Sequence, residues 1–186
     1  MKLRFDGDAD RCVVEGVHGD VLLAALAVHF KHKKIVSTQM FNYGVEQWLS
    51  EQGVQVIRTK VGDRFIKEKM KEMNINFGGE ECGHIIFPDI WKSGDGLVTS
   101  LKVLQMLCES GLDIIQLTKD VTLWPSVLLN IKGKLPACEE FVNGYRILIR
   151  QSGTEDLTRI LVEGPDLDRC HEIALDAAAG ASLDTV

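Results

Sequence analysis

Residues 34–73, KIVSTQMFNYGVEQWLSEQGVQVIRTKVGDRFIKEKMKEM, carry strand and helix signals in alternation. The runs Lys34–Met40 and Val54–Thr59 are rich in β-branched residues and predict strands. Val45–Gln52 and Asp63–Met73 have the pattern of helices. Strands that alternate with helices form βα units on a largely parallel sheet, whose ligand loops follow the carboxyl ends of the strands. The stretch therefore predicts an α/β domain.

The flanking segments extend this domain in both directions. Upstream, Lys2–Phe5 and Cys12–Val17 predict an antiparallel strand pair, and a helix runs from Val21 to about Lys31. We expect Asp20 to cap that helix and Asp63 to cap the helix of the central stretch. Downstream, two helices are predicted, 96–110 and 113–120. The fold expected is a three-layer βα domain with a mixed sheet.

After Trp124-Pro125 the pattern changes to that of a small α+β domain. We interpret the stretch between Asn130 and Tyr145, which contains two glycines and a proline, as a loop. The elements expected in this domain are three strands and a helix: Val127–Ile131, Tyr145–Ile149, Thr158–Val162 and Asp166–Ala179.

Composition restricts the class of protein. The chain has 186 residues and a formal net charge of −6, which argues against nucleic acid or an anionic membrane as a partner. No apolar run approaches the roughly 20 residues that span a bilayer, and no signal peptide opens the chain. The five cysteines are odd in number and include no C-x-x-C pair. This pattern indicates free thiols in a reducing compartment, so we expect a cytoplasmic protein.

The run Asp6-Gly7-Asp8-Ala9-Asp10-Arg11 alternates carboxylates with small residues. In a tight loop this spacing points three hard oxygen ligands at one cation such as Mg²⁺, and the arginine suits a phosphate on that ion. An EF-hand would need glycine at position six and glutamate at position twelve, where the chain has Arg11 and Val17. The remaining alternative is a solvated acidic turn after a strand.

The run Gly78-Gly79-Glu80-Glu81-Cys82-Gly83-His84 is a second candidate site. A carboxylate accepts hydrogen bonds from sugar hydroxyls, and an imidazole can donate to an oxygen or move a proton. The alternative is an acidic turn between two strands.

The run Arg150-Gln151-Ser152-Gly153-Thr154-Glu155, with Arg159 beyond it, follows an apolar strand. Backbone N–H groups and hydroxyls in such a turn form a nest for phosphate oxygens, and two arginines can bracket the same anion. It is not a Walker loop, because the chain contains no G-x-x-x-x-G-K-[ST]. The alternative is a hairpin turn with a surface salt bridge.

A fourth stretch, Lys60-Val61-Gly62-Asp63-Arg64, places two cations at a strand-to-helix turn, where it can border a phosphosugar cleft. A plain helix start explains this stretch alone equally well. Together, the four motifs indicate a protein that binds a phosphosugar and uses a metal ion to assist phosphoryl transfer.

The order and spacing of these motifs resemble the α-D-phosphohexomutase superfamily, and within it the phosphoglucosamine mutase family. Five segments carry the resemblance: Phe5–Arg11, Lys60–Phe65, Gly79–His84, Ser93–Gly96 and Arg150–Glu155. The resemblance implies a Mg²⁺-dependent enzyme in which a phosphoserine exchanges phosphate with a hexose phosphate, here glucosamine 6-phosphate and glucosamine 1-phosphate. Phosphomannomutase or phosphoglucomutase is the alternative within the superfamily.

The resemblance also implies a role for each motif. The metal ligands would be Asp6, Asp8 and Asp10, and the catalytic residues Arg11 and His84. Substrate would be bound by Asp63, Arg64, Glu80, Cys82, His84, Arg150, Ser152, Gly153, Thr154, Glu155 and Arg159. Residues 1–19 would be the remnant of a second mutase domain that carries the metal loop. Residues 20–122 would form the sugar-binding domain and 123–186 the phosphate-binding domain.

The chain departs from the family pattern at three places. No serine is followed by histidine, so we expect the phosphoserine loop to belong to an absent first domain and the chain alone to be inactive. Cys82 stands where the family has serine, and its thiol is a weaker hydrogen-bond partner. The connection between Asn130 and Arg150 is short, which suggests a trimmed last domain.

Two other classes of function stay open. A sugar-phosphate binding fragment or pseudoenzyme would bind ligand without turnover. A metal-dependent phosphatase with an aspartate nucleophile could use Asp6-Gly7-Asp8, but the lysine and distal acidic pair that it needs have no evident place in the sequence. Faces that further domains would cover suggest self-association.

Overall fold

The computed structural model describes residues 1–152 and 155–180. The chain divides into two compact units, Met1–Leu123 and Trp124–Val186, and each is described by itself. Among the described residues, no helix combines the length and apolar character needed to cross a lipid bilayer.

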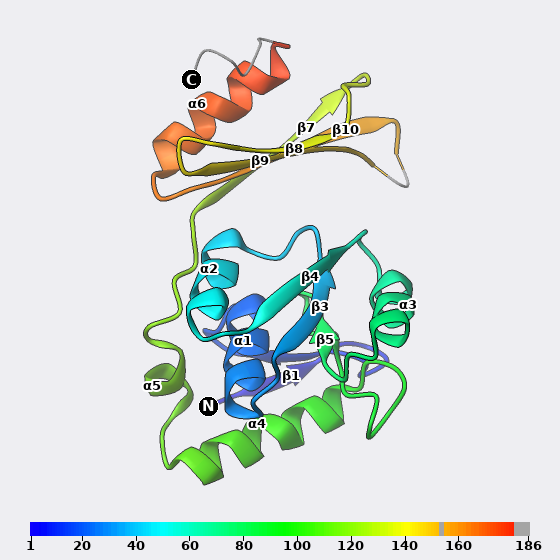
Figure 1. The fold of residues 1–186 in the computed structure, drawn as a ribbon, viewed down its shortest axis with the longest axis vertical. Helices are drawn as coiled ribbons and strands as arrows, with labels where there is room; N and C mark the ends of the chain where they lie inside the picture. Colours follow the sequence, from blue (N-terminus) through cyan, green and yellow to red (C-terminus); the bar gives the residue numbers. More distant parts are fainter. Residues whose placement is uncertain (153–154, 181–186) are drawn as a thin grey trace. The chain divides into compact units, whose positions relative to one another are not determined.

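A four-stranded mixed sheet forms the centre of the first unit (Figure 1). Its strands, in the spatial order β4-β3-β5-β6, are β3 Lys34–Thr38, β4 Gln55–Thr59, β5 Gly78–Gly79 and β6 Ile85–Ile86. Strand β3 is parallel to β4 and β5, whereas β6 is antiparallel to β5. The mixed sheet expected from the sequence is confirmed.

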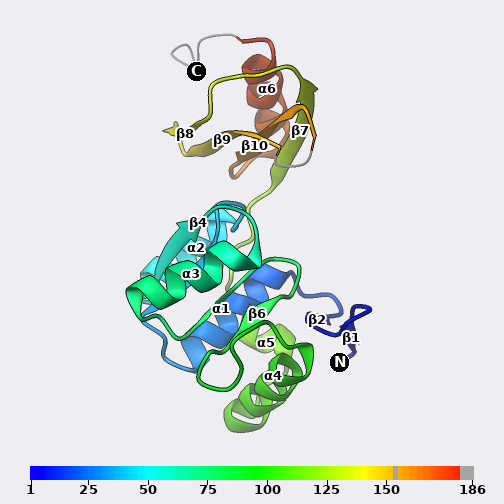
Figure 2. The ribbon, with the colours of Figure 1, turned by 90° about the vertical axis from the view of Figure 1, so that its right-hand side faces the viewer.

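Helices cover both faces of this sheet, as Figures 1 and 2 show. Helix α3 (Asp63–Met73) lies on one face, and α1 (Gly19–His29) and α2 (Tyr43–Glu51) lie on the other. Helices α4 (Gly96–Ser110) and α5 (Ile114–Thr118) pack against α1. Because α1 is enclosed in this way, its residues from Asp20 to Ala27 are all buried.

Two expected helix caps are wrong. The N-cap of α1 is His18, whose Nδ1 accepts a hydrogen bond from the Asp20 N–H at 3.3 Å. Asp20 itself is fully buried in the first turn and accepts a hydrogen bond from the Asn42 N–H at 2.8 Å. In α3 the N-cap is Gly62, and Asp63 is the first helical residue, ion-paired with Lys67. The Asp20 carboxylate is thus engaged by a backbone N–H 22 positions away, and that of Asp63 by a lysine one helical turn on.

A short hairpin precedes α1. Strands β1 (Leu3–Phe5) and β2 (Cys12–Val14) pair antiparallel, with Leu3 opposite Val14. The second strand is shorter than the predicted Cys12–Val17, because Gly16 has a φ of 82° and turns the chain toward α1.

The second unit is an antiparallel sheet with one helix. Its strands, in the order β7-β10-β9-β8, are β7 Ser126–Lys132, β8 Cys138–Val142, β9 Tyr145–Gln151 and β10 Leu157–Glu163. Helix α6 (Leu167–Ala178) packs against β7 and β10. Ile147, Ile160 and Ile173 lie in the core between helix and sheet.

The interpretation of 130–145 as a loop is wrong, because β7 continues to Lys132 and β8 occupies Cys138–Val142. Strand β8 joins β9 through Asn143-Gly144, which have φ values of 50° and 84°. Two residues with positive φ connect a tight hairpin, and Asn-Gly is the sequence signal for that turn.

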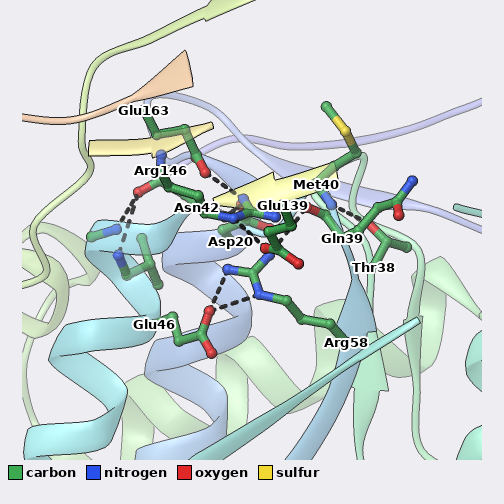
Figure 3. Close-up of polar contacts among 12 residues, drawn as sticks. Asp20, Thr38, Gln39, Met40, Asn42, Glu46, Arg58, Glu139, Arg146 and Glu163 are labelled. Atoms are coloured by element: carbon green, nitrogen blue, oxygen red, sulfur yellow. Dashed lines mark hydrogen bonds and ion pairs between the residues drawn. The ribbon is translucent and has the colours of Figure 1, made fainter. Parts of the chain in front are cut away.

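Each unit contains an arginine that forms ion pairs between neighbouring elements, and Figure 3 shows these contacts. On β9, Arg146 is fully buried and donates to Glu139 at 2.7 Å and to Glu163 on the neighbouring β10. In the first unit, the Arg58 Nε on β4 donates to Glu46 of α2 at 2.8 Å. A buried charge is tolerated only with such partners, so these pairs specify how neighbouring elements lie.

His32, between α1 and β3, makes the stability of the first unit depend on pH. Its ring stacks on Phe77 with centroids 4.5 Å apart, and burial lowers its pKa. The folded state therefore disfavours the protonated form, and stability is lost as the pH falls through the unfolded value of about 6.5. We expect the wild type to lose more unfolding free energy than His32→Phe between about pH 7.5 and about pH 5.5, measured by urea denaturation. Parallel pH profiles would contradict the assignment.

Candidate functional site

A cleft of about 510 Å³ lies in the first unit, beside the carboxyl ends of the parallel strands. It is lined by Asp10, Arg11, Thr38, Met40, Val61, Gly62, Asp63, Glu80, Glu81, Cys82 and His84. The aspartate loop, the Lys60–Arg64 turn and the Gly78–His84 loop therefore contribute to the same cleft.

The aspartate loop gathers three carboxylates. One oxygen from each of Asp6, Asp8 and Asp10 lies within 4.8 Å of the others. The loop curls because Ala9 has a φ of 57° and donates its N–H to the Asp6 carbonyl at 3.2 Å. Hard oxygen donors at this separation fit a hard divalent cation.

Backbone hydrogen bonds attach this loop to two distant segments. The Cys12 N–H donates to the Gly83 carbonyl at 3.0 Å, and the Gly96 N–H donates to the Ala9 carbonyl at 2.8 Å. A Cβ on Gly96 would lie 2.4 Å from the Arg11 carbonyl oxygen, so only glycine permits this approach.

Arg11 lies beside the carboxylates. Its Nε is 3.4 Å from Asp6 Oδ2 and 3.6 Å from Asp10 Oδ1. Nearly half of the side chain is exposed, so the guanidinium can also reach a ligand in the cleft.

His84 connects the second loop to the first. Its Nδ1 lies 3.0 Å from Asp10 Oδ2, and only 4% of the residue is exposed. Its Nε2 is buried, has no hydrogen-bond partner among the described residues, and lies 4.0 Å from Asp63 Oδ2. Because buried polar atoms are almost always hydrogen-bonded, an unpartnered nitrogen in the lining of a cleft is a candidate contact for a ligand.

Three other residues of the second loop, Glu80, Glu81 and Cys82, also line the cleft. One Glu80 oxygen accepts a hydrogen bond from the Gly62 N–H at 3.2 Å, which joins this loop to the start of α3. Burial raises the pKa of the Cys82 thiol, which therefore stays neutral near pH 7.

Asp63 and Arg64 differ in placement. Asp63 lines the cleft, and its hydrogen bond from Lys67, 2.7 Å away, lowers the pKa of the carboxyl. Arg64 pairs with Glu68 at 2.8 Å and is 78% exposed on α3. It is not among the described residues that line the cleft, and its substrate role stays a prediction.

The second unit carries the other predicted site. Arg150 on β9 lies directly opposite Arg159 on β10. Burial and the charge of Arg159 lower the pKa of Arg150, and the Arg159 Nε is buried without a hydrogen-bond partner among the described residues. Like charges opposite one another destabilise a sheet, so an anion between them would relieve the repulsion.

The turn beyond these arginines is described in part. Glu155 lies 3.3 Å from Arg159, and its N–H donates to the Ser152 hydroxyl at 3.3 Å. Gly153 and Thr154, which we also expect to bind phosphate, lie outside the described residues.

Sequence reasoning missed several cleft residues. Thr38 follows from the rule that ligand sites lie at the carboxyl ends of parallel strands, since it ends β3. Met40 carries no local signal, whereas Val61 lies within the Lys60–Arg64 stretch already expected to border the cleft. Gly94 belongs to the Ser93–Gly96 segment, to which the sequence assigned no role in the site. A Cβ at Gly94 would lie 2.4 Å from His84 Nε2.

The fold and the site together define an α/β/α domain followed by a small antiparallel domain. Residues 18–123 match the family model for phosphoglucomutase/phosphomannomutase, alpha/beta/alpha domain III, and residues 137–180 match that for the C-terminal domain. The chain belongs to the phosphoglucomutase/phosphomannomutase family, as the resemblance implied.

Curated relatives agree with this assignment. The chain is 39% identical to a phosphoglucosamine mutase of Thermosipho africanus, covering 93% of this chain and 45% of the relative. It is 41% identical to one of Campylobacter curvus, covering 86% and 41%. The chain thus spans less than half the length of these relatives.

Two solved structures share the fold. A phosphoglucomutase/phosphomannomutase family protein of Burkholderia thailandensis has a TM-score of 0.75 at 24% identity, covering 97% of this chain and 47% of that one. An N-acetylphosphoglucosamine mutase of Aspergillus fumigatus, in complex with GlcNAc-6P and magnesium, has a TM-score of 0.75 at 19% identity, covering 97% and 52%.

The contact between Gly94 and the imidazole predicts a local effect of Gly94→Ala. The new methyl group has no room beside His84, so the ring must move away from Asp10. We expect the imidazole signals of His84 to shift in nitrogen-15 NMR spectra, while those of the other four histidines stay in place. Ser93→Ala is the control at the neighbouring position. An unchanged His84 signal in Gly94→Ala would show that the ring does not depend on this glycine.

The paired arginines predict opposite effects on stability and binding. Arg150→Gln removes the repulsion from Arg159, so we expect unfolding free energy to rise by up to about 1 kcal/mol, while affinity for inorganic phosphate falls at least about tenfold. Arg169→Gln removes the same charge from α6, where Arg169 pairs with Glu172, and should leave phosphate binding unchanged. Calorimetric titration and urea denaturation measure both quantities. Equal losses of affinity in the two variants would rule out a specific site.

Proposed function

We propose that this chain provides the metal-binding and sugar-phosphate-binding parts of a phosphohexomutase that interconverts glucosamine 6-phosphate and glucosamine 1-phosphate in the cytoplasm. The observation that carries the proposal is the buried, unpartnered Nε2 of His84, in a cleft beside three gathered carboxylates. The names of the curated relatives support the choice of substrate. Since the chain spans less than half of their length, the activity of a whole enzyme is part of the proposal.

The carboxylates of Asp6, Asp8 and Asp10 would hold the metal, which we propose is Mg²⁺. Their separation suits one hard cation, and a related fold was crystallised in complex with magnesium. A bound Mg²⁺ would neutralise charge that develops on a phosphoryl group during transfer.

Residues of the cleft would orient and stabilise the reacting groups. The Arg11 guanidinium would donate to phosphoryl oxygens, because its charge and planar geometry match them. His84, oriented by Asp10, would exchange a proton with a sugar hydroxyl through Nε2. Glu80, held by the Gly62 N–H, would accept a hydrogen bond from another hydroxyl.

The second unit would hold the phosphate that is not being transferred. Arg150 and Arg159 would bind it from adjacent strands, and Glu155 would keep the Arg159 guanidinium in place.

The phosphoserine of the mechanism has no candidate in this sequence, because none of its serines is followed by histidine. We propose that the serine belongs to a part of the protein outside this sequence, consistent with the greater length of the relatives. The same observation supports a second candidate function, a sugar-phosphate binding protein without turnover.

Titration calorimetry with glucosamine 6-phosphate, with and without Mg²⁺, combined with a mutase assay on the same sample, tests the proposal. We expect binding without turnover by this chain, and turnover once the remaining half of a related mutase is supplied. Binding without turnover even then would favour the binding protein. Absence of binding would contradict both, and turnover by the chain alone would overturn the account of the serine.

Asp8→Asn tests the metal site without disturbing the fold, because Asp8 is exposed and makes no ion pair with another described residue. Loss of one charged ligand should weaken Mn²⁺ binding at least about tenfold, measured by electron paramagnetic resonance without substrate. Glu72→Gln on α3 removes the same charge outside the loop and should have no effect. Equal affinities in wild type and Asp8→Asn would exclude this loop as the metal site.

A further inference from the structure

A second hollow, of about 470 Å³, lies in the first unit and has no role in the proposed mechanism. We call it the lysine pocket; it is lined by Lys67, Met70, Lys71, Asn74, Ile75, Asn76, Ile86, Pro88, Asp89 and Lys92. Asn74 to Asn76 precede β5. The residues of the cleft that holds Asp10, Arg11 and His84, which we call the sugar cleft, instead follow the carboxyl ends of the parallel strands. The lysine pocket and the sugar cleft therefore use opposite ends of β5.

The floor of the lysine pocket is apolar. Met70, Ile75 and Ile86 line it, and each is less than a tenth exposed. They belong to the small core between α3 and the sheet. An apolar group of a ligand placed on this floor would be removed from water, which favours binding.

The rim carries three cations from two separate segments. Lys67 and Lys71 come from α3, and Lys92 from the loop before α4. Lys71 and Lys92 make no ion pair with another described residue. Asp89 opposes them, but its carboxylate accepts a hydrogen bond from Asn76 at 3.0 Å. The pocket is thus net positive in a chain whose net charge is −6, and that sign attracts anions.

Lys67 connects the two sites through its ion pair with Asp63. It lines the lysine pocket, and its Nζ lies 2.7 Å from Asp63 Oδ2, which lines the sugar cleft. The same Asp63 oxygen lies 4.0 Å from His84 Nε2. An anion that attracts Lys67 would therefore weaken the pairing of Asp63 and change the field at the imidazole.

We propose that the lysine pocket binds an amphiphilic anion, with an apolar body on its floor and a carboxylate among its lysines, and that the Lys67–Asp63 pair transmits this binding to the sugar cleft. The ligand class follows from the combination of apolar floor and cationic rim. The coupling rests on the proposed role of the sugar cleft, but binding in the lysine pocket does not.

Octanoate is a suitable probe, and the chain's own methionines report where it binds. Met70 lies in the lysine pocket and Met40 in the sugar cleft, among five methionines in all. In a carbon-13 methyl-methionine spectrum, octanoate should shift Met70 saturably with a Kd below about 1 mM and leave Met40 in place. Acetate lacks the apolar body and octan-1-ol lacks the charge, so both should bind at least about tenfold more weakly.

Variants that remove a positive charge distinguish binding in the lysine pocket from nonspecific attraction of an anion to the protein surface. Lys71→Gln combined with Lys92→Gln should weaken octanoate binding at least about tenfold. Lys69→Gln removes a charge from the same helix, where Lys69 pairs with Glu72, and should leave binding unchanged. Absence of a Met70 shift, or equal weakening in Lys69→Gln, would overturn the site.

A separate measurement tests whether the Lys67–Asp63 pair transmits binding in the lysine pocket to the sugar cleft. Octanoate should shift the imidazole signals of His84 in the wild type, and this shift should disappear in Lys67→Gln while Met70 still responds at saturating octanoate. A His84 shift that persists in Lys67→Gln, or its absence in the wild type, would overturn the coupling alone. A failure of glucosamine 6-phosphate to shift Met40 would instead count against the proposed function, so the two failures are distinguishable.

Discussion

Two backbone hydrogen bonds hold the aspartate loop in place, and the rest of the site depends on them. The Cys12 N–H reaches the Gly83 carbonyl and the Gly96 N–H reaches the Ala9 carbonyl, which brings together three segments that are far apart in the chain. A two-stranded hairpin is marginally stable in water on its own. The attachment to the Gly83 and Gly96 segments orders it, and this order places Asp10 within hydrogen-bond distance of His84.

Close approach of backbone segments explains why this region needs glycine. A Cβ on Gly83 would lie 2.4 Å from the Cys12 carbonyl oxygen, and one on Gly19 would lie 1.8 Å from that of Glu81. Glycine at these positions lets α1, the hairpin and the Gly78–His84 loop meet without intervening side chains. The cleft is therefore bordered by rigid backbone, which suits a site that must orient a small polar ligand.

Each unit places like charges close together, cations in the second unit and carboxylates in the first. In the second unit Arg150 and Arg159 lie opposite one another, with Glu155 as a partial counterion for Arg159. In the first unit the carboxylates are close together, with Arg11 as a partial counterion. Both sites keep like charges adjacent, as sites for oppositely charged ligands do, and the lysine pocket repeats this principle on a smaller scale.

The sequence by itself determined the alternation of strands and helices, the spacing of the three aspartates and the position of the paired arginines, because these depend on local periodicity and short motifs. The Asn143-Gly144 turn signal of the β8–β9 hairpin is also local, although the glycines and proline around it favour a loop. Only the tertiary structure decided that Asp20 accepts a hydrogen bond from Asn42, that His84 pairs with Asp10, and that Gly94 contacts the imidazole. These contacts join residues up to 74 positions apart, and no local pattern encodes which side chains meet once loops pack together.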